Sequence, residues 1–336
     1  MFVITYKKIF LSIGLFVAAA SMAIVGTLGL NLGIDFTGGA LTEVAYGEPL
    51  AEGTSVSDRV YAIAPEEEIE TAISDLNIDM GGFSVRQTQT DDNREGYIVR
   101  TRDLIEEERI LLTTTLEGLK GGGEVTRFTT IGPVIGEELK DKAIWAIGAV
   151  CLIIILYVAF AFRGVSYPLG SWVYGGVTIL ALIHDVIVPT AVMSLLGYFA
   201  GVEVDILFVM ALLAVLGYSV NDTIVVFDRV RENLILFRQE KKVKKKLDGL
   251  EHEEIEYILT KPFSNIVGEA VGQTFLRSIN TSITTMLVLG ALYFIGGSVT
   301  TTFAFILLIG VLAGTYSSLF LASPMLVFLA GRKGVE

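Results

Sequence analysis

Six apolar runs of about 20 residues or more constrain the fold of this chain most strongly. A helix of about 20 apolar residues crosses the hydrocarbon core of a bilayer and makes all of its backbone hydrogen bonds internally. Only 18% of the 336 residues are charged and 52% are hydrophobic, whereas a soluble domain of this length carries more charge. We therefore predict a polytopic α-helical membrane protein with six transmembrane helices, near residues 9–30, 143–162, 168–197, 206–227, 276–295 and 303–330.

The positions of Lys and Arg predict how these helices are oriented. Lys7 and Lys8 precede the first run, and basic residues recur in the segments after the second, fourth and sixth runs. The two opposite short loops, 198–205 and 296–302, contain neither Lys nor Arg. By the positive-inside rule both termini are cytoplasmic and residues 31–142 are extracytoplasmic. The location that we expect is the inner or plasma membrane. The first run continues past its small residues to full spanning length, so we predict an uncleaved anchor.

Residues 31–142 contain no run long enough to span a bilayer, and their pattern predicts a small mixed domain. Expected strands and helices follow one another in the order β-α-β-β-α-β, which is typical of a ferredoxin-like α+β domain. The domain holds 23 Asp and Glu residues but 10 Lys and Arg residues, so it carries the negative charge of the chain. The total net charge of −12 argues against nucleic acid as a partner.

The expected organisation has five parts. They are a cytoplasmic N-terminus with the first helix (1–30), the extracytoplasmic domain (31–142), helices two to four (143–227), a cytoplasmic charged loop with an interfacial helix (228–275), and the last two helices with a cytoplasmic C-terminus (276–336). The charged loop has a Lys-rich run followed by a Glu-rich run and is predicted to be a solvated hairpin-like loop. The alternative for this loop is contact with anionic lipid headgroups.

Two charged residues inside the apolar runs are the first candidates for a functional site. Asp222 follows Asn221 in the fourth run, and Arg277 begins the fifth; at about 1.5 Å per residue they lie at the same depth. A carboxylate in hydrocarbon is costly unless it is paired, protonated or hydrated, and its pKa follows its surroundings while an Arg stays charged. This pattern indicates a proton relay. The alternative is that Arg277 extends to the interface and the pair only holds helices together.

Asp185 is a second carboxylate inside an apolar run, and His184 precedes it. Because His titrates near neutrality, the pair could pass protons towards Asp222, or it could equally be a polar contact between helices. Asn221 points about 100° away from Asp222 around its helix and suits either an interhelical hydrogen bond or a place in a proton path. A hydroxyl-rich stretch in the fifth run adds two supporting polar residues, Ser278 and Thr281.

No pattern in the sequence points to an enzyme, a cofactor or a metal site. It contains no phosphate-binding Gly loop, catalytic triad or metal-ligand spacing. Glu66, Glu67 and Glu68 lie at an expected helix start, where acidic residues stabilise the helix dipole. We therefore expect no bound cofactor, no metal and no catalytic residues.

Several motifs of this chain resemble those of the SecF family of protein translocase subunits. They are LGIDFTGGA (32–40), IGPVIGEELKDKAIWA (131–146), ALIHDVIV (181–188), GYSVNDTIVVFDRVREN (217–233) and RSINTSITTM (277–286), and together they extend over nearly the whole chain. The first of them places the family motif just outside the first helix, at Asp35, Phe36, Thr37, Gly38 and Gly39. The segment between the fourth and fifth runs is longer than in typical members, as if by an insertion.

The resemblance implies a fold like half of an RND-type transporter and a role in protein export. It implies SecD as a partner with a similar fold, association with the SecY-E-G channel, YajC as a further candidate partner, and unfolded preproteins as substrates. It also implies use of the proton-motive force, with Asp222 and Arg277 at the positions of the family's proton pathway and Asp185 at a further motif position. Two alternatives remain: an RND-like exporter of small molecules or lipids, and a non-conducting scaffold of the translocase.

Overall fold

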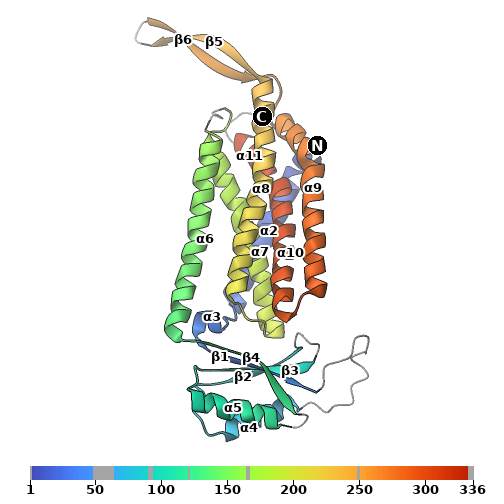
Figure 1. Cartoon of the computed structure of the whole chain (residues 1–336). Coiled ribbons are helices and arrows are strands. Elements are labelled where there is room, and N and C mark those ends of the chain that lie inside the picture. Colours follow the sequence, from blue (N-terminus) through green and yellow to red (C-terminus); the bar gives the residue numbers. More distant parts are fainter. Residues whose placement is uncertain are drawn as a thin grey trace.

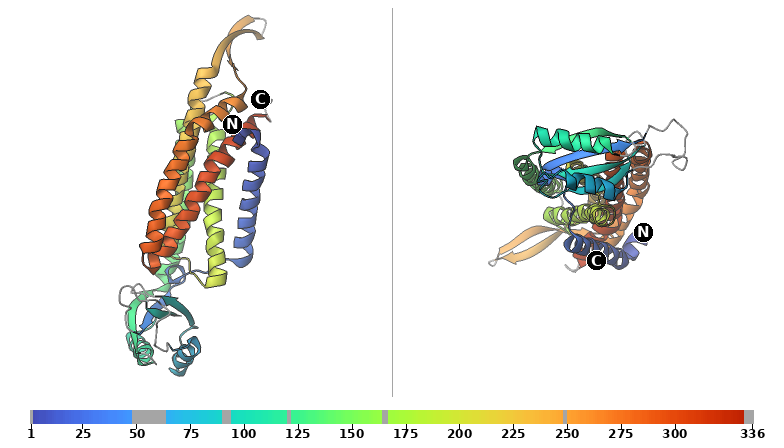
Figure 2. Two further views of the ribbon diagram at one scale, coloured as in Figure 1. Left: turned by 90° about the vertical axis from the view of Figure 1, so that its right-hand side faces the viewer. Right: turned by 90° about the horizontal axis from the view of Figure 1, so that it is seen from below.

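The computed structural model describes residues 2–47, 64–89, 94–119, 122–163, 167–247 and 250–331. They form a bundle of long helices with a small sheet domain at one end and a two-stranded ribbon at the other (Figure 1). Both ends of the chain lie at the ribbon end of the bundle (Figures 1 and 2). Residues 332–336, the expected cytoplasmic C-terminus, lie outside the described residues.

Within the described residues, six helical segments are long and apolar enough to cross a membrane, which confirms the expected number. They are α2 (Lys7–Leu28), α6 (Pro133–Ala161), α7 (Ser171–Ala200), α8 (Ile206–Phe237), α9 (Phe263–Ile295) and a sixth segment made of α10 (Ser298–Tyr316), the π-helix η2 (Ser317–Ala322) and α11 (Ser323–Gly331). Two short helices, α1 (Phe2–Thr5) and α3 (Ile34–Thr37), flank α2.

Several helices are longer than the apolar runs predicted. Helix α6 begins at Pro133, ten residues before the expected second span, and α8 continues to Phe237. The interfacial helix expected at the end of the charged segment, at 263–275, is helical as predicted but continues into the fifth span, so α9 runs without a break from Phe263 to Ile295. The first turns of α9 stay helical because Phe263, Ile266 and Ala270 pack into the bundle core. The expected short loop at 296–302 is shorter than predicted, because α10 already begins at Ser298.

The charged segment between α8 and α9 is a β-hairpin, which agrees with the expected hairpin-like form and adds regular strand pairing to it. Strands β5 (Arg238–Leu247) and β6 (Leu250–Leu259) pair antiparallel from Arg238 opposite Leu259 to Leu247 opposite Leu250. The Lys-rich run lies on β5 and the Glu-rich run on β6, so the register pairs runs of opposite charge.

The sheet domain has the ferredoxin-like arrangement that the element order predicts. Its elements are β1 (Gly39–Tyr46), α4 (Glu66–Asp75), β2 (Ser84–Gln89), β3 (Glu95–Thr101), α5 (Glu106–Gly118) and β4 (Gly123–Ile131). The strand order is β2-β3-β1-β4, and every neighbouring pair is antiparallel. Ile69 and Leu112 of the two helices bury their side chains against Val44 and Val99 of the strands. The helices cover the face turned away from the bundle, so the other face of the sheet meets the membrane helices (Figure 1).

The interior of the bundle is built mainly from α7, α8 and the sixth segment, whereas α2, α6 and α9 expose most of their apolar length. Two glycines let α10 approach α8 closely. A methyl group on Gly310 would lie 2.1 Å from Val215 Cγ2, and one on Gly314 would lie 2.9 Å from Ser219 Cβ. Small residues four apart allow this kind of contact between membrane helices, and here they bring η2 next to the middle of α7 and α8.

Candidate functional site

Polar side chains gather in the middle of the bundle, where α7, α8, α9 and η2 meet. Asp185 of α7 is fully buried and Asp222 of α8 is only 6% exposed, although both helices are apolar. Fully buried serines come from three of these elements: Ser219, Ser278, Ser317 and Ser318. The sequence predicted the two carboxylates and Ser278, and the packing of the helices adds the other serines.

Asp185 accepts hydrogen bonds from two other elements of the bundle and contacts the histidine beside it in α7. Its Oδ2 accepts from Ser219 Oγ of α8 and from Ser317 Oγ of η2, the latter at 2.7 Å. Its Oδ1 lies 3.1 Å from His184 Nδ1. The imidazole stacks on the Tyr316 ring at 5.8 Å between centroids, and among the described residues His184 Nε2 has no hydrogen-bond partner. Asp185 therefore joins α7 to α8 and η2 and also contacts a titratable imidazole, so the packing and proton-path interpretations both remain open.

Two adjacent serines of the π-helix lie near two different carboxylates. A π-turn adds a residue to the helical turn and rotates the following side chains, and such turns occur often at functional sites. Ser317 bonds Asp185, while Ser318 lies close enough to act electrostatically on Asp222. Ser318 Oγ also donates to Gly314 O at 2.7 Å within its own helix.

Asp222 is a buried carboxylate whose hydrogen bonding is incomplete. Ser278 and Arg277 of α9 act on its charge together with Ser318. Within the described part of the chain, however, Asp222 Oδ2 has no hydrogen-bond partner, and neither have Ser278 Oγ and Thr223 Oγ1. An unpaired buried polar atom costs about 1–3 kcal/mol, and an ionised one costs more. The site is therefore suited to a protonated carboxyl group or to water molecules that bridge these oxygens.

The direct ion pair expected between Asp222 and Arg277 is absent from the described residues. Arg277 is exposed on the outer surface of α9, while Ser278 is fully buried. Consecutive residues on a helix differ by about 100°, so only one of the two can face α8. The sequence placed Arg277 at the correct level but could not fix the rotation of α9, which turns Ser278 towards Asp222.

The remaining predicted polar residues lie on the outside of this chain. Asn221 is exposed on α8, and Thr281 is exposed on α9, where its hydroxyl donates to Arg277 O of the same helix at 2.8 Å. Inside the bundle, a second group of hydroxyls links three helices, which the sequence did not reveal. Tyr218 OH lies 3.3 Å from Ser282 Oγ, which lies 2.6 Å from Thr315 Oγ1.

The sequence contains signals for the buried serines that were not predicted. Ser219 precedes Asp222 by three residues, a spacing that places both on one face of α8. Ser317 and Ser318 interrupt an apolar run that otherwise predicts a featureless sixth span. Only the packing of η2 against α7 and α8, however, determines which carboxylate each of these serines faces.

The DFTGG motif lies at the other end of the bundle, between the sheet domain and the membrane helices. Asp35 and Phe36 are in α3, and Asp35 Oδ2 accepts a hydrogen bond from Ile206 N, the first residue of α8, at 2.8 Å. The two glycines lead into β1 with positive φ, +72° at Gly38 and +123° at Gly39. The motif is therefore far from Asp222 along α8 and belongs to the joint between the two parts of the protein.

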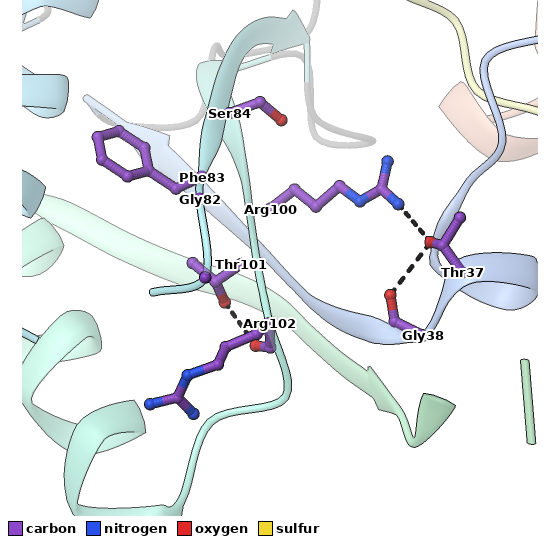
Figure 3. Close-up of a pocket in the computed structure, with 9 residues that line it drawn as sticks. Thr37, Gly38, Gly82, Phe83, Ser84, Arg100, Thr101 and Arg102 are labelled. Atoms are coloured by element: carbon purple, nitrogen blue, oxygen red, sulfur yellow. Dashed lines mark hydrogen bonds between the residues drawn. The ribbon is translucent and has the colours of Figure 1, made fainter. Parts of the chain in front are cut away.

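A pocket of about 370 Å³ opens beside this joint (Figure 3). It is lined by Thr37, Gly38, Gly81, Gly82, Phe83, Ser84, Arg100, Thr101 and Arg102. Its two guanidinium groups already have protein acceptors: Arg100 donates to Thr37 and Leu32 O, and Arg102 donates to Asp79 O and Glu108. Hydrogen bonding to Glu108 raises the pKa of Arg102 above its ordinary value, so the charge of this guanidinium group is already paired within the protein. No group of metal-ligating side chains is found among the described residues.

Two family models match the chain. The model described as "Protein export membrane protein SecD/SecF, C-terminal" matches residues 112–332, and the model of the SecD/SecF GG motif matches residues 23–49. The protein translocase subunit SecF of Thermobaculum terrenum is 37% identical over 303 residues, which cover 89% of this chain and 84% of the relative. The SecF subunit of Sebaldella termitidis is 31% identical over 323 residues, covering 96% and 90% of the two chains.

A solved structure has the same fold over nearly the entire chain. The crystal structure of SecDF, a translocon-associated membrane protein from Thermus thermophilus, superimposes with a TM-score of 0.72 at 31% identity. The match covers 98% of this chain but 38% of the SecDF chain. The present chain therefore corresponds to somewhat more than one third of that longer protein.

Proposed function

The chain belongs to the SecF branch of the SecD/SecF family of protein-export membrane proteins, and from this premise we propose that it uses the proton-motive force together with a SecD partner. In this proposal it promotes the movement of unfolded preproteins through the SecY-E-G channel and their release on the outer side. YajC is a further candidate partner. The protein has no catalytic role of its own and binds no cofactor.

The observation that carries the proposal is the incomplete hydrogen bonding of Asp222 in the middle of the bundle. Asp222 Oδ2 and Ser278 Oγ have no partners among the described residues, while Asp185 nearby in the bundle accepts bonds from two serines. Protonation removes the cost of an unpaired charge on Asp222, and deprotonation restores it. The two protonation states therefore favour different packings of α8 against α9 and η2.

The driving force is adequate for such a change. One charge that crosses a membrane potential of 100 mV releases about 2.3 kcal/mol. Because about 1.4 kcal/mol changes an equilibrium constant tenfold, one proton can shift a two-state equilibrium by more than tenfold. Repacking of α8 would then move the sheet domain relative to its partner and bias the preprotein outward.

The orientation of the chain follows from its basic residues. Lys7, Lys8 and Lys261 lie at the ribbon end of the bundle, whereas residues 198–205 and 296–302 at the opposite end contain no Lys or Arg. We place the ribbon end and both termini in the cytoplasm and the sheet domain outside it.

Exposed polar side chains on the membrane helices support a SecD partner. Asn221 of α8 and Arg277 and Thr281 of α9 are exposed in the isolated chain, and contact of such groups with hydrocarbon is unfavourable. A second set of helices would cover them and would supply groups for Arg277. The SecDF chain that superimposes on this one is much longer, so its additional residues are sufficient to contain a second set of helices.

The decisive variant is Asp222→Asn, which keeps the size of the side chain but cannot bind and release a proton. Export of a preprotein into inverted membrane vesicles is measured with the proton gradient intact and after its collapse by a protonophore. We expect normal assembly with SecD and loss of the gradient-dependent part of export. Asp228→Asn is the matched control, because Asp228 lies on the same helix in a partly exposed 2.7 Å ion pair with Arg231.

The opposite result favours a scaffold. If Asp222→Asn exports like the native protein and keeps its dependence on the gradient, the buried polar groups act as contacts between helices and the proton relay is refuted. The network of Asp185, Ser219 and Ser317 is the specific feature that would serve such a scaffold, because it ties three elements together.

A further inference from the structure

The first helical turn of α8 is capped by two carboxylates, and one of them comes from a distant part of the chain. Asp205, the N-cap residue, accepts from Phe208 N at 2.9 Å. Asp35 accepts from Ile206 N at 2.8 Å, although it is 171 residues away in the sequence. A helix leaves its first N–H groups without internal partners, so each carboxylate satisfies a different orphan donor.

Backbone bonds fix the chain around Asp35 to the residues that precede α8. Gly33 N donates to Val204 O at 2.8 Å, and Val204 N donates to Asn31 O at 2.7 Å, which makes a short parallel bridge. Phe36, the neighbour of Asp35, is 6% exposed and packs in one apolar cluster with Phe208. Helix α3 and the start of α8 therefore form one packed unit.

The same short helix is fixed to the sheet domain on its other side. Thr37 Oγ1 accepts from Arg100 of β3, and Thr37 and Gly38 lie beside that guanidinium in the pocket (Figure 3). A methyl group on Gly39 would lie 2.6 Å from Thr101 O, and one on Gly38 would lie 2.6 Å from Pro133 Cα at the start of α6. The two glycines thus allow α3, β1, β3 and α6 to meet with almost no space between their backbones.

From this arrangement we propose that Asp35 is a positioning residue that couples the sheet domain to α8 and, along α8, to Asp222. Helix α8 runs unbroken and without proline from Ile206 to Phe237, so a shift at Ile206 reaches Asp222 about 24 Å further along the helix. The DFTGG motif joins α8 to the sheet domain. Asp35 accepts a hydrogen bond from the first turn of α8, Phe36 packs against that turn, and the two glycines allow the domain to approach closely. The role in export rests on the proposed function, but the joint itself does not.

The chemistry of the contact predicts which substitutions preserve it. Asn accepts a hydrogen bond from a helix N–H about as well as Asp, whereas Leu has a similar size and no acceptor. Asp35→Asn should therefore keep the coupling, and Asp35→Leu should lose it. The domain stays attached in both variants, because Arg86 of β2 donates independently to Gly201 O at the end of α7.

The test measures the joint directly in the full chain with its SecD partner. After Cys151→Ser removes the single native cysteine, spin labels at Thr114 of α5 and Met210 of α8 report the distance distribution between domain and helix. We expect a narrow distribution in the native protein and in Asp35→Asn, and a broad one in Asp35→Leu. Asp205→Ala is the matched control, since it removes a cap from the same helix turn and leaves the link to the domain. Its distribution should stay narrow.

Export assays on the same variants give the second measurement. The hydrogen bond between Asp35 and Ile206 N links the domain to α8, and a bond of typical cap strength corresponds to about a fivefold change in an equilibrium constant. The gradient-dependent part of export should therefore fall about fivefold in Asp35→Leu, which breaks this link. Asp35→Asn and Asp205→Ala should keep it. An unchanged distance distribution in Asp35→Leu overturns the inference, and so does equal loss in Asp35→Asn and Asp35→Leu. If export by the native protein does not depend on the proton gradient, the proposed function is refuted. The distance measurement still shows whether Asp35 couples the sheet domain to α8.

Discussion

The close contact between α8 and α10 predicts that Gly310→Ala is strongly destabilising. The new methyl group would lie 2.1 Å from Val215 Cγ2, 2.9 Å from Cγ1 and 3.1 Å from Cβ. Carbon atoms in good contact are about 3.5–4.0 Å apart, so the two helices would have to separate locally by more than 1 Å. Rotation of the Val215 side chain cannot remove the clash fully, because it leaves Cβ in place at 3.1 Å.

The expected cost can be estimated from this misfit. Overpacking of a well-packed core typically costs about 1–3 kcal/mol and occasionally more, and a misfit of this size belongs at the upper end. Gly314→Ala meets Ser219 Cβ at 2.9 Å and should cost less. It should nevertheless disturb the site, because Ser219 donates to Asp185.

The assay is the temperature at which half of the detergent-solubilised protein remains monodisperse by size-exclusion chromatography. Gly217→Ala is the matched control, since Gly217 lies on α8 and a methyl group there meets nothing within 4 Å. We expect losses of several degrees for Gly310→Ala, smaller losses for Gly314→Ala, and none for Gly217→Ala. Equal stability of Gly310→Ala and Gly217→Ala would refute the reasoning from close packing.

Two further predictions concern the joint beneath α8. Gly38→Ala should lower the temperature midpoint of the same assay, because its φ of +72° with ψ of 171° is almost exclusive to glycine. The new methyl group would also lie 2.6 Å from Pro133 Cα. Gly118→Ala is the control and should not lower the midpoint, because a methyl group there meets nothing within 4 Å. Burial raises the pKa of Asp205 above 3.8, and the charge of Asp35 raises it further. The ionised form of Asp205 therefore destabilises the fold at neutral pH. This cost disappears as the pH falls below the pKa values of Asp205 in the folded and in the unfolded chain. Asp205→Asn keeps an acceptor for Phe208 N and should raise the midpoint more at pH 7 than near pH 4. An equal gain at both pH values would contradict this explanation.

Most of the architecture could be predicted from residue patterns along the chain. The six helices follow from the match between run length and bilayer thickness, and the β-α-β-β-α-β order follows from local periodicity. Both signals are local, so they do not depend on knowing the neighbours in space. The ends of α8 and α9 were missed because their polar turns extend beyond the apolar runs, and packing of Leu234 and Ile266 into the bundle core stabilises them.

The sequence by itself also determined the family and the main candidate, Asp222, because a carboxylate in an apolar run is conspicuous without any structure. Only the tertiary structure decided which groups meet it. The rotation of α9 turns Ser278 inward and Arg277 outward, and the packing of η2 against α7 brings Ser317 to Asp185. The contact between Asp35 and Ile206 likewise depends on two segments 171 residues apart. Helix rotation and long-range contacts are set by close packing among several elements at once, and no local pattern in the chain encodes them.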